Sequence, residues 1–349
     1  MLFIVPFEKG TPFPCLSTNM GRSNQMGKTN RQQHHLKFGI WLDEMKLPFD
    51  EALAVAKRIG AEYVWFAELP GETAIAEMSD AEVDRMGERV ARHGLKLFQI
   101  CAENPFHYIR LMDLQPDSIQ DHPAFRKDFN ALIRAMQIAA RLDVSAVLAY
   151  GLSWPGEWSQ QGRTWGRAPT WPMRWATRGG IIADDDMDKL INIFSLVLEQ
   201  AEQYNVDVVL GMRPFHHIST TTHFRLLAER LGSPRLKFQL SPGDSLLSAE
   251  CDVATAGFTH VRPYLHGLHI KDVHVIDGPK GSYEWRPFGE GDVDYPTLMG
   301  NLFEHRCEVF LAVATHFRPP GGSDVEAMEI NFANVTSLVS LLADQQRRD

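Results

Sequence analysis

Residues 184–210 read DDDMDKLINIFSLVLEQAEQYNVDVVL. The first part carries apolar residues at helical spacing, which predicts an amphipathic helix over 184–204. Those residues are Leu190, Ile193, Leu196, Leu198 and Ala201. The last part, 206–210, is a short apolar run typical of a buried strand. The stretch is therefore one helix-strand unit of an α/β fold.

The same unit recurs along the chain. Further strands are expected at 37–42, 62–67, 96–101, 144–150, 236–240, 265–270 and 308–313. Further helices are expected at 49–59, 81–93, 124–142, 223–231, 249–261, 295–303 and 325–342. Short apolar strands that alternate with helices indicate parallel strands covered on both faces. Eight such units predict a single closed (β/α)8 barrel.

An open doubly wound sheet is the rival fold. Such a sheet usually has a glycine-rich turn after its first strand, where a dinucleotide binds. Here residues 41–45 read WLDEM, without glycine, so a dinucleotide site is disfavoured.

The composition is that of an ordinary globular protein, with 44% hydrophobic and 23% charged residues among 349. We expect the barrel to span residues 36–349 as one domain. Residues 17–35 are polar and show no period, so residues 1–35 are expected to be a disordered arm. A targeting segment and an over-long start are the two alternatives for that arm.

Charge and cysteine content exclude several classes of protein. A net charge of −9 argues against nucleic acid as a partner. The four cysteines are widely spaced, which excludes a disulfide scaffold and a zinc ribbon and favours a reducing compartment, so we expect a cytoplasmic location. No apolar run is long enough for a membrane span, and no membrane partner is expected.

Functional residues of a (β/α)8 barrel lie where strands end and helices begin. Polar and aromatic side chains at these points are Asp43, Glu44, Glu68, Glu103, Asn104, Trp154, Arg213, His216, His217, Asp244, His269, Lys271, Asp272, His274 and His316. The candidate catalytic residues are Glu68, His269 and Asp272. The candidate substrate-binding residues are Trp154, Trp158, Arg213, His216, Asp244 and Lys271.

The same residues also have structural interpretations. Glu68 is as well explained by an ion pair with a barrel arginine. Asp272 is typical of a residue that caps the following turn. His269 could simply pack the barrel mouth, and His216 and His316 could be ordinary polar loop residues. The sequence leaves these alternatives open.

Three stretches resemble the sugar isomerase/epimerase superfamily, which has a xylose-isomerase-like barrel. They are LHGLHIKD at 265–272, PFGEGDVDY at 287–295 and FQLSPGD at 238–244. The resemblance implies a small carbohydrate ligand, a sugar or sugar-like polyol, bound at the carboxyl end of the barrel. It also implies a divalent metal held by Glu, Asp, His and Glu at the ends of strands five to eight, with the two Glu residues moving a proton beside the sugar carbonyl.

The chain departs from that pattern at three of the four ligand positions. Gly211, Ser241 and Ala314 stand where carboxylates are expected, and only His269 matches. One imidazole does not hold Mg²⁺ or Mn²⁺, so neither ion is expected. A rebuilt site from His269, His316 and Asp244, with His216 nearby, would suit Zn²⁺ or Fe²⁺ instead.

Residues 151–180 hold five of the eight tryptophans and follow the fourth strand. A connection this long is usually functional when it is not disordered. Trp154 and Trp158 are expected either to close over a ligand or to lie in the interface of a homo-oligomer. Residues 274–286 are expected to form a surface hairpin or a second wall of the site.

Three functional classes remain open. The first is a sugar isomerase or epimerase with a remodelled site. The second is a barrel that has lost catalysis and binds a ligand or partner. The third is a metal-free lyase or hydrolase acting on a glycoside through Glu68, Asp272 or His269.

Overall fold

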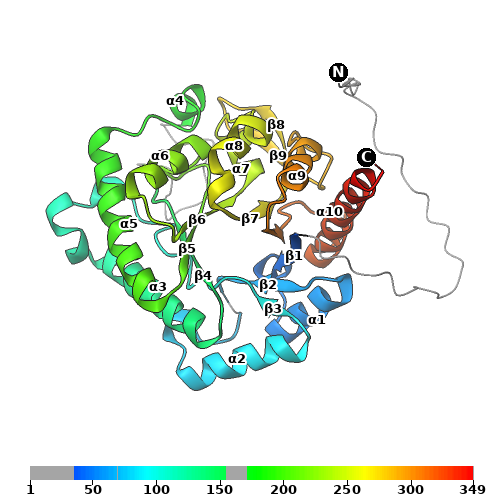
Figure 1. Cartoon of the computed structure of the whole chain (residues 1–349), viewed down its shortest axis with the longest axis horizontal. Coiled ribbons are helices and arrows are strands. Elements are labelled where there is room, and N and C mark those ends of the chain that lie inside the picture. Colours follow the sequence, from blue (N-terminus) through cyan, green and yellow to red (C-terminus); the bar gives the residue numbers. More distant parts are fainter. Residues whose placement is uncertain (1–34, 69, 155–170, 349) are drawn as a thin grey trace, which may run out of the picture. The chain divides into compact units, whose positions relative to one another are not determined.

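Eight parallel strands form the centre of the molecule, in the order β3-β2-β1-β10-β7-β6-β5-β4 (Figure 1). Their bounds are β1 Leu36–Trp41, β2 Tyr63–Trp65, β3 Lys96–Leu97, β4 Ala146–Tyr150, β5 Asp207–Gly211, β6 Leu236–Leu240, β7 Leu265–Ile270 and β10 Val309–Val313. This computed structural model describes residues 35–348 except 69 and 155–170. The predicted arm therefore lies outside the described residues, apart from His35.

The sheet closes on itself between β3 and β4. Ile100, just beyond β3, donates its N–H to Ala146 O at 3.0 Å and accepts from Leu148 N at 2.9 Å. These two bonds join the first and last strands of the sheet, which confirms the predicted (β/α)8 barrel. Strand β3 is shorter than the predicted 96–101 because the chain leaves the ladder to β2 after Leu97.

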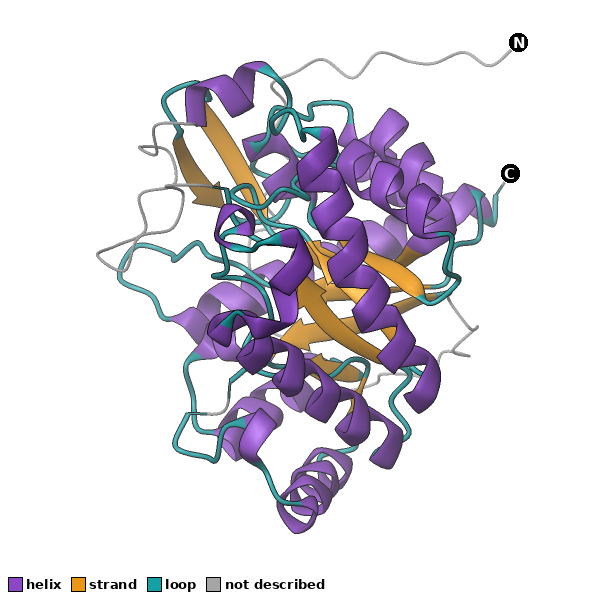
Figure 2. Ribbon diagram, turned by 90° about the vertical axis from the view of Figure 1, so that its left-hand side faces the viewer, coloured by secondary structure: helices purple, strands orange, loops and turns teal. Residues whose placement is uncertain are grey.

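Helices surround the strands, as Figure 2 shows. They are α1 Phe49–Ile59, α2 Asp80–Arg92, α3 Pro123–Arg141, α5 Asp184–Tyr204, α6 Thr221–Leu231, α8 Phe258–Val261, α9 Tyr295–Glu304 and α10 Asp324–Gln346. The predicted helix at 249–261 instead forms a wide helical turn, Val253–Gly257, followed by the short α8. In the part of the chain that the structure describes, no helix has the length and apolar character needed to cross a membrane.

Three further elements stand at the carboxyl ends of the strands. They are α4 Trp171–Ala176, α7 Pro242–Leu247, and an antiparallel hairpin of β8 Asp272–Asp277 and β9 Ser282–Arg286. The hairpin confirms one of the two expectations for residues 274–286.

Aromatic rings fill the inside of the barrel. Trp41, Trp65, Phe98 and Tyr150 pack there with small residues such as Ala312. Glycines make room for the rings: a Cβ on Gly39 would lie 3.0 Å from the Phe98 ring. The interior is thus a packed core, in which His266 stacks on Phe98, and further polar side chains gather at the carboxyl end.

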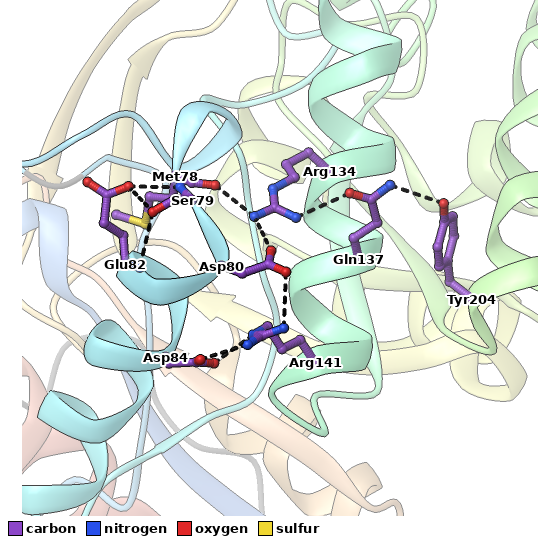
Figure 3. A network of polar contacts seen from close by, with 9 residues as sticks. All are labelled: Met78, Ser79, Asp80, Glu82, Asp84, Arg134, Gln137, Arg141 and Tyr204. Atoms are coloured by element: carbon purple, nitrogen blue, oxygen red, sulfur yellow. Dashed lines mark hydrogen bonds and ion pairs between the residues drawn. The ribbon is translucent and has the colours of Figure 1, made fainter.

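A network of arginines spans the outside of the β3–β4 seam (Figure 3). Arg134 of α3 donates to Met78 O at 2.7 Å and to Asp80 Oδ1 at 2.9 Å. Arg141 of α3 makes a bidentate pair with Asp84 of α2 at 2.6 and 2.7 Å. Because α2 packs beside β3 and α3 beside β4, the network ties the two helices together where the strand ladder is shortest.

Candidate functional site

Strand register points a set of polar side chains into the carboxyl end of the barrel. His269 of β7 is paired with Ala312 of β10, which belongs to the interior core. Directly paired residues of parallel strands share a face, so His269 points inward, and Lys271 follows it on the same face. Helix α7 begins at Pro242, directly after β6, and its first turn carries Asp244.

The Lys271 ammonium lies at the centre of this group. Its Nζ is 3.0 Å from Asp244 Oδ2 and 3.2 Å from His316 Nε2. It also lies 4.9 Å from the centre of the Trp285 ring of β9. Both charged side chains are buried: 1% of the Lys271 side chain is exposed and none of that of Asp244. A buried ion pair of this kind needs further partners to offset its desolvation.

Glu44 lies behind His316 and fixes its orientation. The His316 ring places Nδ1 2.7 Å from Glu44 Oε1, and its backbone N–H donates to Oε2 at 3.1 Å. Burial alone would raise the pKa of Glu44, but His316 outweighs burial and the pKa falls to about 2. An ionised carboxylate only accepts, so Nδ1 carries the proton and Nε2 presents its lone pair to Lys271. Burial lowers the pKa of His316, which keeps the ring neutral.

Arg213, just beyond β5, is the second cation of the group. Its Nη1 lies 3.6 Å from Asp244 Oδ2 and its Nη2 donates to the Tyr150 hydroxyl at 3.2 Å. Burial lowers the pKa of Lys271 to about 8; Asp244 opposes that shift and Arg213 adds to it. Lys271 is therefore readily deprotonated for a lysine, whereas Asp244 always retains a cationic neighbour.

Several buried polar atoms on β6, on β7 and directly after β6 have no hydrogen-bond partner among the described residues. Both ring nitrogens of His269 belong to this group, together with Gln239 Nε2 and Ser241 Oγ. Burial lowers the pKa of His269 well below its usual value, so the ring is neutral, with one donor and one acceptor nitrogen. Its neighbours are the indoles of Trp41 and Trp65, at 5.4 and 6.1 Å. Buried polar groups are normally hydrogen-bonded, so this face of the barrel is suited to a polar ligand.

Comparison with known proteins agrees with this architecture. A family model described as a xylose isomerase-like TIM barrel matches residues 53–329. The chain belongs to this family. Among curated proteins, none is similar enough to count as a match.

Solved structures of the same barrel include three that are informative. An L-ribulose 3-epimerase is 14% identical, with a TM-score of 0.64 over 89% of this chain and 97% of its own. An IOLI protein with a bound zinc atom is 14% identical, with a TM-score of 0.64 over 88% and 99%. A barrel from Mycobacterium smegmatis in complex with magnesium is 15% identical, with a TM-score of 0.58 over 88% and 97%. At these identities the likeness shows the fold.

The residues of this chain do not fit the divalent metal that the family resemblance implies. A Cβ on Gly211 would lie 2.9 Å from the Tyr150 ring, so that ring fills the place of a strand-five carboxylate. Ser241 and Ala314 offer no carboxylate either. Within the described ranges, no three His, Cys, Asp or Glu side chains are arranged to hold a metal ion.

The rebuilt metal set predicted from the sequence is also not brought together. His269 and His316 are 6.3 Å apart between ring centres. Lys271 Nζ, itself a cation, contacts both Asp244 and His316. His216 belongs to another cluster, in which its Nε2 is 3.2 Å from His107 O and its ring packs on Phe215.

The side chains of the other predicted site residues do not join the group around the Lys271 ammonium. Asp272 is buried, and its two oxygens accept four backbone N–H groups of its own strand and the following loop. Glu68 is exposed at the end of β2, and no ion pair links it to an arginine within the described part of the chain. Trp154 stacks on His217 at 3.9 Å, whereas Trp158 lies outside the described residues.

One contributor to the site, Glu44, was not assigned a role from the sequence, and another, Trp285, lies in the segment expected to form a hairpin or a second wall. Glu44 was selected only by its position after the first strand, and its partner His316 lies 272 residues away. Trp285 of the hairpin packs 4.9 Å from the His316 ring, so the hairpin also forms the second wall that the sequence suggested. The aromatic content of residues 283–286 was the signal for that wall.

Proposed function

We propose that this chain catalyses proton transfer beside the carbonyl of a small sugar or sugar-like polyol, without a divalent metal. The observation that carries this proposal is the buried contact of Lys271 with both Asp244 and His316, with Glu44 behind His316. Lys271 takes the part that the family resemblance gives to a divalent metal, which is to polarise the carbonyl. The fold-level likeness to an L-ribulose 3-epimerase supports a ketose as the ligand.

The reaction needs an electrophile at the oxygen and a base at the neighbouring carbon. Lys271 serves as the electrophile, because positive charge on its nitrogen in a buried site stabilises the negative charge that develops on the substrate. His316 Nε2 takes the proton from carbon, and Glu44 stabilises the resulting imidazolium through Nδ1. Return of that proton to the adjacent carbon completes an isomerisation, whereas an epimerisation needs a proton delivered to the opposite face of the original carbon.

The surroundings of Lys271 suit a polyol. The Trp285 indole beside the Lys271 ammonium presents a flat face that matches the C–H faces of a sugar. His269, neutral and with both ring nitrogens unpartnered within the described residues, can donate to one hydroxyl and accept from another. Because Trp285 lies against both Lys271 and His316, hairpin β8–β9 must move aside for a ligand to reach the ammonium.

Hydrogen exchange in heavy water tests the proposal directly. The full chain is incubated with L-ribulose, D-tagatose, D-fructose or D-xylulose in D₂O containing EDTA, and loss of the proton beside the carbonyl is followed by NMR. We expect exchange with at least one ketose, reduced about a hundredfold or more in Lys271→Met. Lys280→Met, which removes an exposed lysine in the turn of hairpin β8–β9, is the matched control, and it should catalyse exchange like the wild type.

Two results would decide against the proposal. Exchange that disappears in EDTA and returns with Mn²⁺ would show a metal-dependent reaction. Ketose binding in calorimetry with no exchange would favour the alternative that the barrel only binds its ligand. Circular dichroism of each variant, recorded first, confirms that loss of exchange does not reflect loss of fold.

A further inference from the structure

We propose that Lys271 activates the ligand covalently, by forming an imine with the carbonyl of an open-chain keto sugar. This inference rests on the proposed function and specifies how the carbonyl is activated. An activated nucleophile is recognised by a base within hydrogen-bond reach and a third group that orients that base. Lys271 Nζ, His316 and Glu44 have this arrangement, with distances of 3.2 and 2.7 Å.

His316 is positioned to receive the proton that the ammonium must lose. Glu44 accepts from both the ring Nδ1 and the backbone N–H of His316, which leaves Nε2 as an acceptor aimed at Nζ. The backbone of His316 has a φ of 62°, in the left-handed region that few non-glycine residues adopt. Such conformations persist where surrounding contacts enforce them, and here the contact is with Glu44.

The charge balance of the group also permits a neutral lysine. When Lys271 gives up its proton, Asp244 keeps Arg213 as a partner at 3.6 Å, so no carboxylate is left uncompensated. Arg213 is itself held by Tyr150 and by the carbonyl of Met212, at 3.2 and 2.8 Å. The pairing of one carboxylate with two cations therefore lets one cation become a nucleophile while the other stays charged.

The covalent step balances in atoms and electrons. The neutral amine adds to the carbonyl carbon, the C–N bond forms, and the oxygen takes the proton held by His316. The resulting carbinolamine loses that oxygen as water and becomes a protonated imine, so no oxidant or reductant is needed. The positive nitrogen then withdraws electrons from the neighbouring C–H bond, and His316, neutral again, removes its proton. The resulting enamine takes a proton back on carbon and becomes an imine again, and water hydrolyses that imine to the amine and the product.

Reductive trapping tests the imine. The full chain is treated with sodium borohydride in the presence of dihydroxyacetone, and separately with the ketose that exchanges best in D₂O. Reduction of an imine adds the mass of the ligand less one oxygen atom. We expect this gain on the peptide that contains Lys271, in the wild type and in Lys280→Met, and not in Lys271→Arg. Arginine keeps the positive charge at position 271 but forms no such imine.

Oxygen exchange provides a measurement that does not depend on access of borohydride to the site. Passage through an imine replaces the carbonyl oxygen of the ketose with one from water, so heavy-oxygen water labels the ligand. We expect the wild type to label it about tenfold or more faster than Lys271→Arg. Proton exchange that persists in Lys271→Arg, with no adduct and equal oxygen labelling, would overturn the imine and leave the proposed function standing. Absence of proton exchange in the wild type itself would overturn both the imine and the proposed function.

Discussion

Replacing Asp272 by Asn separates a structural role of this carboxylate from the catalytic role that the sequence suggested. Asp272 Oδ2 accepts the N–H groups of Gly289 and Gly291, at 2.9 and 3.1 Å. Its Oδ1 accepts those of Val273 and Val293, at 2.9 and 3.3 Å. The side chain therefore joins the end of β7 to the loop that leads into α9.

The size of the effect follows from the number of acceptors lost. Asn retains one carbonyl oxygen, so two of the four N–H groups face an amide nitrogen that cannot accept. Each buried donor left without a partner costs roughly 1–3 kcal/mol. Gly289 is exposed, so the new amide should turn its nitrogen toward Gly289 and let water satisfy part of the loss. We expect Asp272→Asn to lower the free energy of unfolding by about 2 kcal/mol and Asp272→Ala, which loses all four bonds, by about twice as much.

Urea denaturation at pH 7 measures both variants. Glu290→Gln, an exposed change in the same loop, is the matched control and should remain within about 0.5 kcal/mol of the wild type. If Asp272→Asn were as stable as the wild type while ketose exchange was lost, the loop-holding role would be wrong and a catalytic role would be favoured.

A pH series adds a second readout on the same residue. Burial raises the pKa of Asp272 from 3.8 to about 6, against the effect of its four N–H donors. Between these values the native state holds a proton that the unfolded chain has released. Stability from this group is thus present below about pH 4 and falls as the pH rises through about 6. The free energy of unfolding of Asp272→Asn should not show this fall between about pH 4 and 6.

Two further predictions concern the barrel interior and the buried histidines. Gly211→Ala places a Cβ 2.9 Å from the Tyr150 ring and should destabilise the fold by about 1–3 kcal/mol in thermal unfolding. The control Gly300→Ala in α9 adds a Cβ in open space and should be neutral or stabilising. Equal effects of the two substitutions would mean that the Tyr150 ring moves aside freely. Burial lowers the pKa of His217 from 6.5 to about 3, so the unfolded state gains a proton first on acidification and stability falls below about pH 6.5. His217→Asn keeps a donor for Leu152 O but does not titrate, so it should lose less stability than the wild type between pH 7 and 5. A loss equal to that of the wild type would assign the acid sensitivity to other groups.

The sequence predicted the barrel well because its strands and helices have clear apolar periods. Helices α1 and α5 and strands β6 and β7 coincide with the ranges expected from pattern alone. The short helix α7 was missed because it is less than two turns long and begins at a proline that also suits a loop. The end of β3 was overestimated because the apolar run at 96–101 continues past the point where the chain turns toward β4.

The candidate site was predicted in its parts but not in its arrangement. Position after a strand selected Lys271, Asp244 and His316, and the structure places Asp244 and His316 against the Lys271 ammonium, while their roles stay predictions. The sequence could not show that Glu44 orients His316, since that contact depends on β1 pairing with β10 at the other end of the chain. Nor could the spacing show that the Lys271 ammonium lies between Asp244 and His316. A strand pattern gives the face of a residue, while the neighbour it meets depends on the whole closed barrel.

Two features of the site are best understood together. One is the absence of carboxylates at the positions where the family resemblance implies metal ligands, and the other is the presence of a buried lysine. Gly211, Ser241 and Ala314 together subtract three carboxylates from the family pattern, which leaves Glu44 and Asp244 as the acidic groups around Lys271. Lys271 and Arg213 already balance those two charges, and the histidines beside them are neutral. A divalent cation placed here would meet no excess negative charge, and burying its uncompensated charge is costly. The same balance explains why an internal ammonium is tolerated at the mouth of the barrel, because Asp244 lies against both Lys271 and Arg213. The EDTA and Mn²⁺ arms of the exchange experiment therefore examine the electrostatics of the site as well as its reaction.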